Sequence, residues 1–319
     1  MMMPMPLSPD VQLDAATGIS QGGREYQEDA VIADCAMDAE LSLVVLADGM
    51  GGHAAGDVAS KIAVTEVFSE LKLQSGNVQA LVNGAPDILR GAVLAANECI
   101  GEHVRTDAST RGMGTTLLAL VLFGRQVFWV SVGDSPLLLY RDGELRQINE
   151  DHSLAPQIDV LVRAGQMSPE DGLRHPDRNC LTSVVCGKEI PRLDCPASPV
   201  ELADSDILVA ATDGLLGLGH ARIEQILQSH SARDSGEIVR ALLDALSEVG
   251  DPDQDNATLA VLRVGEARRV RPWWPVGATT GAKAPIPASP ARTLLAALVS
   301  PFRSALPVGM FSFRRDRLR

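Results

Sequence analysis

Residues 41–53 read LSLVVLADGMGGH, a short apolar run that ends in Asp48 and is followed by three glycines. Val44 and Val45 favour an extended chain, so we predict a buried strand over this run. The turn after it carries few side chains, which allows a ligand to approach the backbone closely. A carboxylate beside accessible carbonyl groups offers the hard oxygen ligands that a divalent cation prefers.

Two later apolar runs end in the same way, residues 126–133 before Asp134 and residues 207–212 before Asp213. Antiparallel strands bring such distant ends to one edge of a sheet. The acidic residues at strand ends and in the turns beside strands are Glu28, Asp29, Asp48, Asp134, Asp213 and Asp255. Crowded carboxylates repel one another strongly unless cations neutralise them.

Oxygen ligands without a His or Cys cluster favour Mg²⁺ or Mn²⁺ over Zn²⁺. Two such ions about 3.5–4 Å apart activate a water and stabilise an in-line displacement at phosphorus. Arg24 precedes Glu28 and Asp29 in the sequence, and it is the candidate to hold a phosphate through a pair of hydrogen bonds. The acidic set therefore predicts metal-dependent chemistry at phosphorus.

The composition indicates a globular protein, because 45% of the 319 residues are apolar and only 3% are aromatic. The net charge is −13, with +8 on residues 266–319 and −21 on the rest, which argues against nucleic acid as a partner. Five cysteines without a C-x-x-C pair fit reduced thiols in a cytosol. We see neither a secretory signal nor an apolar run near the ~20 residues of a membrane-spanning helix.

Apolar periodicity and turn residues predict the secondary structure. We expect strands over residues 14–20, 30–36, 41–47, 115–123, 126–133, 137–140, 144–148, 207–212 and 257–264. We expect helices over residues 54–73, 86–103, 154–164, 221–228 and 235–249. The first two helices should pair over one sheet, and the four strands between residues 115 and 148 should form one antiparallel meander, since their links are short. Residues 165–187 lack periodicity and predict an excursion over the surface.

Seven short motifs then identify a family, and they occur in the order Arg24-x-x-Gln27-Glu28-Asp29, Ala47-Asp48-Gly49-Met50-Gly51-Gly52-His53, Gly112-Met113-Gly114-Thr115-Thr116, Val132-Gly133-Asp134-Ser135, Asp151-His152-Ser153, Ala211-Thr212-Asp213-Gly214 and Asp255-Asn256-Ala257-Thr258. Each motif alone is weak, but the ordered set over residues 14–264 resembles the metal-dependent Ser/Thr protein phosphatases (PPM, type 2C) in their bacterial form. The resemblance implies an α+β fold, a four-layer α-β-β-α sandwich with two central antiparallel sheets. It also implies a centre of two Mn²⁺ or Mg²⁺ ions, with a possible third.

The resemblance implies an enzyme that hydrolyses phosphoserine and phosphothreonine on proteins by direct attack of a hydroxide that bridges two metals. Carried onto this chain, Asp48 bridges both ions and the carbonyl of Gly49 binds the second. Asp213 and Asp255 hold the first ion.

Four further positions take their expected roles from the same resemblance. Asp29 acts on the second ion and Glu28 acts on it through water. Asp134 matches the position that helps to bind a third, weaker metal in bacterial members. Arg24 holds the substrate phosphate.

The chain departs from the family pattern at three positions. Gln27 stands where bacterial members often have Asn, and Pro136 stands where Arg is common. Met50 replaces the His of eukaryotic members, as is usual in bacterial ones. None of these changes removes a metal ligand, so we expect an active enzyme.

Other interpretations were weighed against this one. The Asp48 turn mimics a dinucleotide-binding loop, but an acid directly before the first glycine would repel a pyrophosphate. Residues 251–255 mimic a calcium loop, but Asn256 stands where that loop needs Gly. The alternative function is a catalytically silent signalling module that binds a kinase or regulator. A second possible enzyme is a phosphatase that acts on a regulator of sigma factors.

We divide the chain into a loose N-terminus (1–13), a phosphatase domain (14–265) and a basic Pro/Arg-rich tail (266–319) that we expect to be flexible. The expected partners are phosphoprotein substrates and a cognate Ser/Thr kinase, with no nucleic acid. The tail is a candidate to contact a partner or an anionic membrane. We expect a cytoplasmic monomer.

Overall fold

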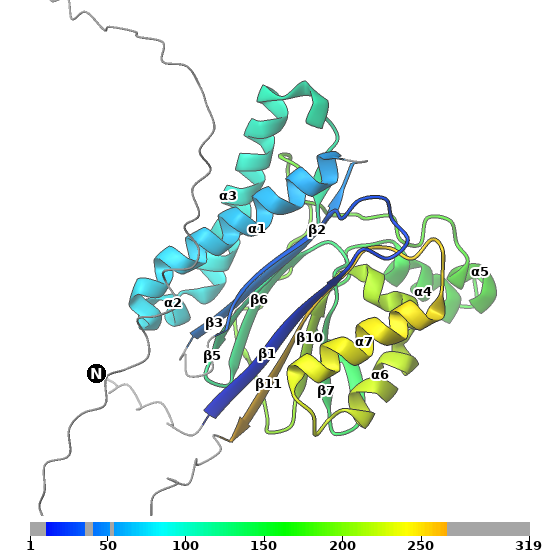
Figure 1. Ribbon diagram of the computed structural model, residues 1–319. Coiled ribbons are helices and arrows are strands. Elements are labelled where there is room, and N and C mark those ends of the chain that lie inside the picture. Colours follow the sequence, from blue (N-terminus) through cyan, green and yellow to red (C-terminus); the bar gives the residue numbers. More distant parts are fainter. Residues whose placement is uncertain (1–10, 36–40, 52–53, 267–319) are drawn as a thin grey trace, which may run out of the picture. The chain divides into compact units, whose positions relative to one another are not determined.

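A computed structural model describes residues 11–35, 41–51 and 54–266 of the chain, and their strands form two antiparallel sheets (Figure 1). Sheet A has the order β1-β11-β10-β7-β8, and sheet B has the order β2-β3-β5-β6-β9, with β4 paired to β3. The strands are β1 (Val11–Ser20), β2 (Asp29–Asp34), β3 (Leu41–Met50), β4 (Gly114–Thr115), β5 (Leu117–Phe123), β6 (Gln126–Val132), β7 (Leu137–Arg141), β8 (Glu144–Gln147), β9 (Val200–Glu201), β10 (Ile207–Ala211) and β11 (Ala257–Glu266).

Helices cover the outer faces of both sheets (Figure 1). The α-helices are α1 (Ala54–Gln74), α2 (Val78–Asn83), α3 (Ala85–Thr106), α4 (Ala155–Arg163), α5 (Pro169–Leu173), α6 (His220–Ser229) and α7 (Ser235–Val249). As expected, α1 and α3 pair over sheet B, while α6 and α7 cover sheet A. The 3-10 helices are η1 (Ser75–Asn77), η2 (Ala108–Thr110) and η3 (Asp213–Leu218).

Strand β3 shows why its sequence is apolar at nearly every position. Side chains alternate between the two faces of a strand. Val45 and Ala47 pack toward α1 and α3, whereas Val44 and Leu46 pack between the two sheets with apolar residues of sheet A. Because both faces are buried, no polar alternation remains. The predicted four-layer α-β-β-α sandwich is confirmed.

The prediction of one meander between residues 115 and 148 is wrong. β5 pairs with β6 in sheet B, but β7 pairs with β8 in sheet A. The chain crosses between the sheets at Asp134-Ser135-Pro136, which had the composition of a hairpin turn. Face-to-face sheets lie ~10 Å apart, and three extended residues span about that distance.

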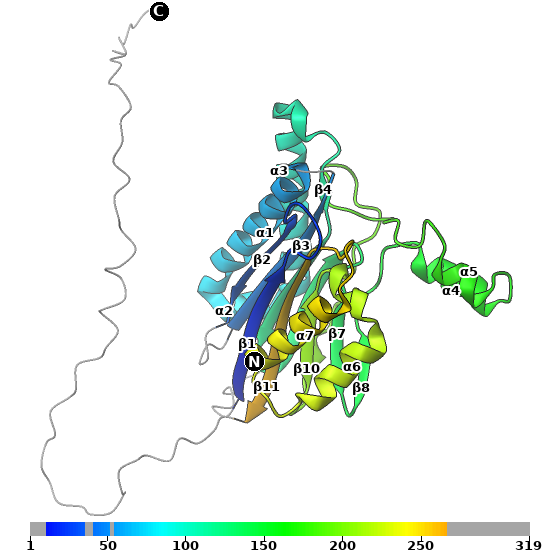
Figure 2. The same cartoon turned by 45° about the vertical axis from the view of Figure 1, so that its right-hand side comes forward.

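Other differences are local. β1 begins at Val11 rather than at residue 14. The predicted excursion over residues 165–187 contains α5, whose first turn is capped by the Ser168 side chain. Helices α4 and α5 lie away from the two sheets (Figure 2).

Some predictions fall outside the described residues, namely those for the N-terminal residues 1–10 and for the tail after residue 266. Within the described ranges, no helix has both the length and the hydropathy that crossing a membrane would require. All five cysteines are free thiols.

Candidate active site

The predicted acidic residues meet at one end of the two sheets. In sheet B, Asp29 begins β2 and lies directly opposite Asp48 of β3 in the antiparallel register. In sheet A, Asp213 follows β10 and Asp255 precedes β11, and these two strands are antiparallel neighbours. Two strand ends of sheet B and two strand ends of sheet A therefore bring these carboxylates together.

Hydrogen bonds from β4 and the residue after it hold the backbone of Asp48. The amide of Thr116 donates to the Asp48 carbonyl at 2.9 Å, and the Thr115 hydroxyl donates to the same oxygen at 2.8 Å. The Asp48 amide in turn donates to Thr116 Oγ1 at 3.0 Å. Because three hydrogen bonds restrain this backbone, the strand end presents its carboxylate in one position.

Glycine is the only residue type that fits at position 49, directly after Asp48. A Cβ atom at this position would lie 2.2 Å from the Gly56 carbonyl oxygen and 2.5 Å from the Glu28 carbonyl oxygen. The Gly49 amide donates to that Glu28 oxygen at 3.2 Å. The turn, the start of α1 and the loop before β2 thus pack backbone against backbone.

A threonine joins the two sheets at the site. Thr212 Oγ1 donates to Asp29 Oδ2 at 2.8 Å and accepts from the Thr258 amide at 2.9 Å. Thr212 is fully buried. Its hydroxyl therefore links the strand ends of sheet A to the first carboxylate of sheet B.

Asp134 lies on the link that crosses between the sheets. The neighbouring Ser135 hydroxyl is 2.8 Å from Thr116 Oγ1, the group that binds the Asp48 amide. On the other side, the Gly133 amide donates to Nδ1 of the buried His152 at 3.2 Å. His152 thus supports the backbone of the link that carries Asp134.

Burial and mutual repulsion make these carboxyls weak acids. Burial, followed by repulsion from Asp29, Asp213, Asp134 and Asp255, raises the pKa of Asp48 far above its ordinary value. Burial also raises the pKa of Asp29 and that of Asp134 to about 7 each. The same causes raise the pKa of Asp213, and a hydrogen bond with Asp48 partly offsets the rise.

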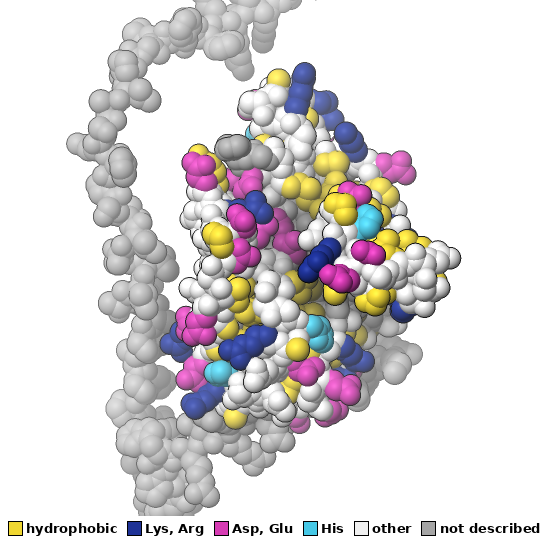
Figure 3. Space-filling view, turned by 90° about the vertical axis from the view of Figure 1, so that its right-hand side faces the viewer, with side chains coloured by type: hydrophobic (Ala, Val, Ile, Leu, Met, Phe, Trp, Pro, Cys, Tyr) yellow, Lys and Arg dark blue, Asp and Glu magenta, His cyan; other side chains and the backbone are white. Residues whose placement is uncertain are grey.

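Arg24 lies against this acidic group from the β1–β2 loop. Its Nη2 is 2.6 Å from Asp255 Oδ2, and about half of the Arg24 side chain is exposed. Figure 3 shows acidic side chains gathered on this side of the molecule with a basic side chain among them. A cation in contact with both solvent and the carboxylates is placed to meet an anionic group that enters.

The donor set fits hard divalent cations. The Oδ1 atom of Asp213 is buried and has no hydrogen-bond partner among the described residues. Within that part of the chain, no three His, Cys, Asp or Glu side chains already form a group arranged to hold a metal ion. Converging carboxylates repel one another, and Mg²⁺ or Mn²⁺ bound to their oxygens would offset that repulsion.

Sequence reasoning did not assign a role to several residues that shape the site. These are Thr116, Ser135, Thr212 and Asn256. Each occurs in one of the seven motifs, but a buried hydroxyl or amide gives no periodic signal. The one available signal was position, because Ser135, Thr212 and Asn256 each adjoin a predicted acidic residue.

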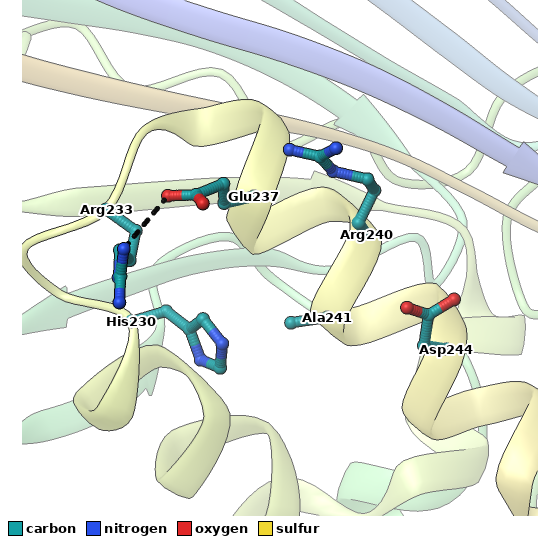
Figure 4. Close-up of a pocket in the computed structure, with 6 residues that line it drawn as sticks. All are labelled: His230, Arg233, Glu237, Arg240, Ala241 and Asp244. Atoms are coloured by element: carbon teal, nitrogen blue, oxygen red, sulfur yellow. Dashed lines mark ion pairs between the residues drawn. The ribbon is translucent and has the colours of Figure 1, made fainter.

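A surface groove of about 370 Å³ lies elsewhere, between the end of α6 and α7 (Figure 4). It is lined by His230, Arg233, Glu237, Arg240, Ala241 and Asp244. The nearby start of α7 is anchored to Asp14, because the Ser235 amide donates to Asp14 Oδ2 at 2.7 Å. Asp14 lies six residues from the site end of β1 at Ser20, or ~20 Å along a strand. The groove is therefore separate from the acidic residues.

Comparison with known proteins shows which family the chain resembles. The family model described as protein phosphatase 2C matches residues 23–175. The serine/threonine phosphatase stp of Listeria monocytogenes is 36% identical over 188 residues, which are 59% of this chain and 72% of that protein. The serine/threonine protein phosphatase PstP of Mycobacterium tuberculosis is 33% identical over 76% of this chain and 43% of its own length.

Solved structures agree with the sequence relatives. The crystal structure of the M. tuberculosis phosphatase PstP/Ppp matches with a TM-score of 0.65 and 31% identity, over 79% of this chain and 98% of that chain. The catalytic domain of PstP in complex with two manganese ions matches with a TM-score of 0.62 and 30% identity, over 80% of this chain and 99% of that chain. The fold, the ordered motifs and these relatives agree, and the chain belongs to the protein phosphatase 2C (PPM) family of serine/threonine phosphatases.

Proposed function

We propose that the acidic end of the two sheets carries the reaction of this metal-dependent serine/threonine protein phosphatase. The observation that supports this most is the convergence of Asp29, Asp48, Asp134, Asp213 and Asp255, in which burial and neighbouring acids raise the pKa values of the first four. Such a group is costly to bury without compensating charge. Mn²⁺ or Mg²⁺ supplies that charge when bound and activates water for attack at phosphorus.

The ligand roles are those that the resemblance to the phosphatase family implies for these positions. Asp48, between the two sheets' strand ends, would bridge two ions, and the Gly49 carbonyl would bind one of them. Asp213 and Asp255 of sheet A would hold the other ion, and Asp213 offers an oxygen without a protein partner. These assignments rest on the resemblance, and the proximity of Asp48 to Asp213 and Asp255 supports them.

The remaining three residues complete the proposal. Asp29 would contact the second ion, and Glu28 would act on it through water. Asp134, on the link between the sheets, would help to hold a third and weaker metal. Burial raises the pKa of Asp134, and the nearby Asp213 and Asp151 raise it further.

Arg24 would bind the substrate phosphate. A guanidinium forms two parallel hydrogen bonds to phosphate oxygens, which fixes the orientation of the ester. Its ion pair with Asp255 is about half exposed, so exchange of that carboxylate for a phosphate costs little. Arg24 thereby orients the phosphorus over the acidic group.

The setting of the enzyme is part of the proposal. Its substrates are phosphoproteins, and we infer a cognate Ser/Thr kinase that generates them. Five free thiols support a reducing, cytoplasmic location. We expect a monomer, with contact between the basic tail after residue 266 and a protein partner or an anionic membrane.

Phosphate release from phosphoserine, phosphothreonine and phosphotyrosine peptides tests the proposal. With Mn²⁺ we expect turnover of the first two peptides, its loss in EDTA, and its loss in Asp48→Asn. Asp244→Asn is the matched control, because Asp244 is exposed on α7. Mn²⁺ binding without turnover of any peptide would favour the silent signalling module instead.

A further inference from the structure

Asn256 binds three separate points of the loop that carries Arg24. Its Nδ2 donates to the Gln21 carbonyl at 2.8 Å and to the Tyr26 carbonyl at 3.0 Å. Its Oδ1 accepts from the Glu28 amide at 2.7 Å. An Asn side chain has two N–H donors and one carbonyl acceptor, so every part of this amide is used.

Burial does little to hold the exposed part of this loop in shape. All residues from Gln21 to Tyr26 are exposed, so burial of apolar side chains contributes little there. Gln21 Nε2 donates to the Arg24 and Glu25 carbonyls at 2.8 and 3.1 Å, which are contacts within the loop itself. Asn256, in contrast, is 4% exposed and is anchored at the start of β11. The buried amide is therefore the fixed side of this interface.

Backbone packing shows that the loop lies closely on the segment before Asn256. The Gly23 amide donates to the Gln254 carbonyl at 2.8 Å. A Cβ atom at Gly23 would lie 2.0 Å from the Pro252 carbonyl oxygen. The two segments touch through their backbones, so the loop that carries Arg24 packs directly against the segment that leads into Asn256.

The same contacts extend to the other sheet. The amide of Glu28 is bound by Asn256, and its carbonyl accepts from the Gly49 amide at 3.2 Å. Glu28 therefore connects the Asp255–Asn256 strand end with the Asp48–Gly49 turn. Asn256 thus contacts the loop on both sides of Arg24, at Gln21 and at Tyr26 and Glu28.

We propose that Asn256 is a positioning residue for phosphate binding, which acts by holding the loop of residues 21–28 so that Arg24 lies beside Asp255. The proposal rests on the phosphatase function assigned above. Asn256 touches neither substrate nor reacting atoms. It contributes by fixing Arg24 before substrate arrives, which lowers the ordering cost of binding.

The first test is a double-mutant cycle of Asn256→Ala and Arg24→Ala with p-nitrophenyl phosphate and Mn²⁺. We expect Asn256→Ala to raise KM by about tenfold, with kcat changed by less than about threefold. In the Arg24→Ala background, Asn256→Ala should change kcat/KM by less than about twofold, because its target is already absent. Independent, multiplying effects of the two substitutions would overturn the proposal.

Asn97→Ala is the matched control. Asn97 Oδ1 accepts from the Cys186 and Gly187 amides at 3.1 and 2.8 Å, and its Nδ2 donates to the Lys188 carbonyl at 2.7 Å. The substitution removes the same number of hydrogen bonds away from Arg24. We expect KM in Asn97→Ala to stay within about twofold of the wild type. A KM increase equal to that of Asn256→Ala would show a general structural effect and would overturn the proposal.

Hydrogen–deuterium exchange tests the contacts without relying on activity. In Asn256→Ala, the amides of residues 21–28 should exchange at least about tenfold faster, while those of α7 stay unchanged. Unchanged exchange in residues 21–28 would overturn the proposal. If the wild type proved inactive, the phosphatase assignment would fail, and this measurement would still decide whether Asn256 holds the loop.

Discussion

Arg24 and Asp255 form an ion pair at 2.6 Å across 231 residues of sequence. Both side chains are partly exposed, so the pair itself contributes little to stability. Its consequence is positional, because it places a guanidinium beside the carboxylates of Asp255 and Asp213. The first prediction follows from this placement.

Arg24→Ala should lower kcat/KM for p-nitrophenyl phosphate about 100-fold, because charge-assisted hydrogen bonds to the phosphate are lost. Arg24→Lys keeps the charge but not the geometry for two parallel hydrogen bonds, so its kcat/KM should lie between those of the wild type and Arg24→Ala. Steady-state kinetics with Mn²⁺ measure this, and thermal unfolding should show nearly equal midpoints for all three proteins. If the wild type and Arg24→Ala had equal kcat/KM values, Arg24 would not bind the substrate phosphate.

Thr212→Val should destabilise the protein by ~1–3 kcal/mol, because it removes the donor to Asp29 and leaves the buried Thr258 amide without its acceptor. Urea unfolding of the EDTA-treated protein measures this. Thr212→Ser keeps the hydroxyl and is the control, with an expected loss well below that of valine. If serine and valine were equally destabilising, packing rather than the hydroxyl would be responsible.

Gly49→Ala should lower stability by more than ~2 kcal/mol and weaken Mn²⁺ binding, since the new methyl group would meet the Gly56 and Glu28 carbonyls. Gly91→Ala is the matched control in α3, where a Cβ would meet nothing within 4 Å. That change should be neutral or stabilising by ~0.5–1 kcal/mol. Comparable losses in both variants, seen by thermal unfolding and calorimetry, would contradict the close packing at Gly49.

The EDTA-treated protein should lose thermal stability between about pH 5.5 and about pH 8. Burial, the largest cause, raises the folded-state pKa values of Asp29 and Asp134 from 3.8 to about 7. Folding therefore takes up protons, and this proton uptake stabilises the folded protein. The stabilisation is fully present below the pKa of 3.8 that these groups have in the unfolded chain, and it is lost as the pH rises through 7. Saturating Mn²⁺ should reverse the trend, because metal binding needs the deprotonated groups.

Scanning calorimetry at both pH values measures this dependence, with Asp29→Asn as the control. Asn cannot take up the proton, so the slope without metal should become shallower. A midpoint that rises with pH in EDTA would contradict the raised pKa values.

The sequence was sufficient for the layers of the fold. Long helices such as α1 and α7 have clear apolar periodicity, and β3 and β10 are apolar runs that end in Asp-Gly. The crossing at Asp134-Ser135-Pro136 was not predictable, because the same composition also suits a hairpin and only tertiary packing separates the two. The short α2 and β9 lacked enough residues for a periodic signal.

The acidic residues of the site were predictable because strand ends recur with one chemistry. The structure brings Asp29, Asp48, Asp134, Asp213 and Asp255 together as expected, whereas their roles toward metals stay predictions. The hydrogen bonds of Thr212 and Asn256 were not predictable. The Thr212 bond joins residues that are 183 positions apart, and the Asn256 bonds join residues that are at least 228 positions apart. Sequence patterns report only local neighbours.

The most direct test of the metal centre is a calorimetric Mn²⁺ titration of the wild type, Asp213→Asn and the control Asp244→Asn. We expect two tightly bound ions in the wild type and in Asp244→Asn, as in the manganese complex of the PstP catalytic domain. Asp213→Asn should lose at least one of them. Absence of Mn²⁺ binding in the wild type, or unchanged binding in Asp213→Asn, would contradict the assignment of these carboxylates as metal ligands.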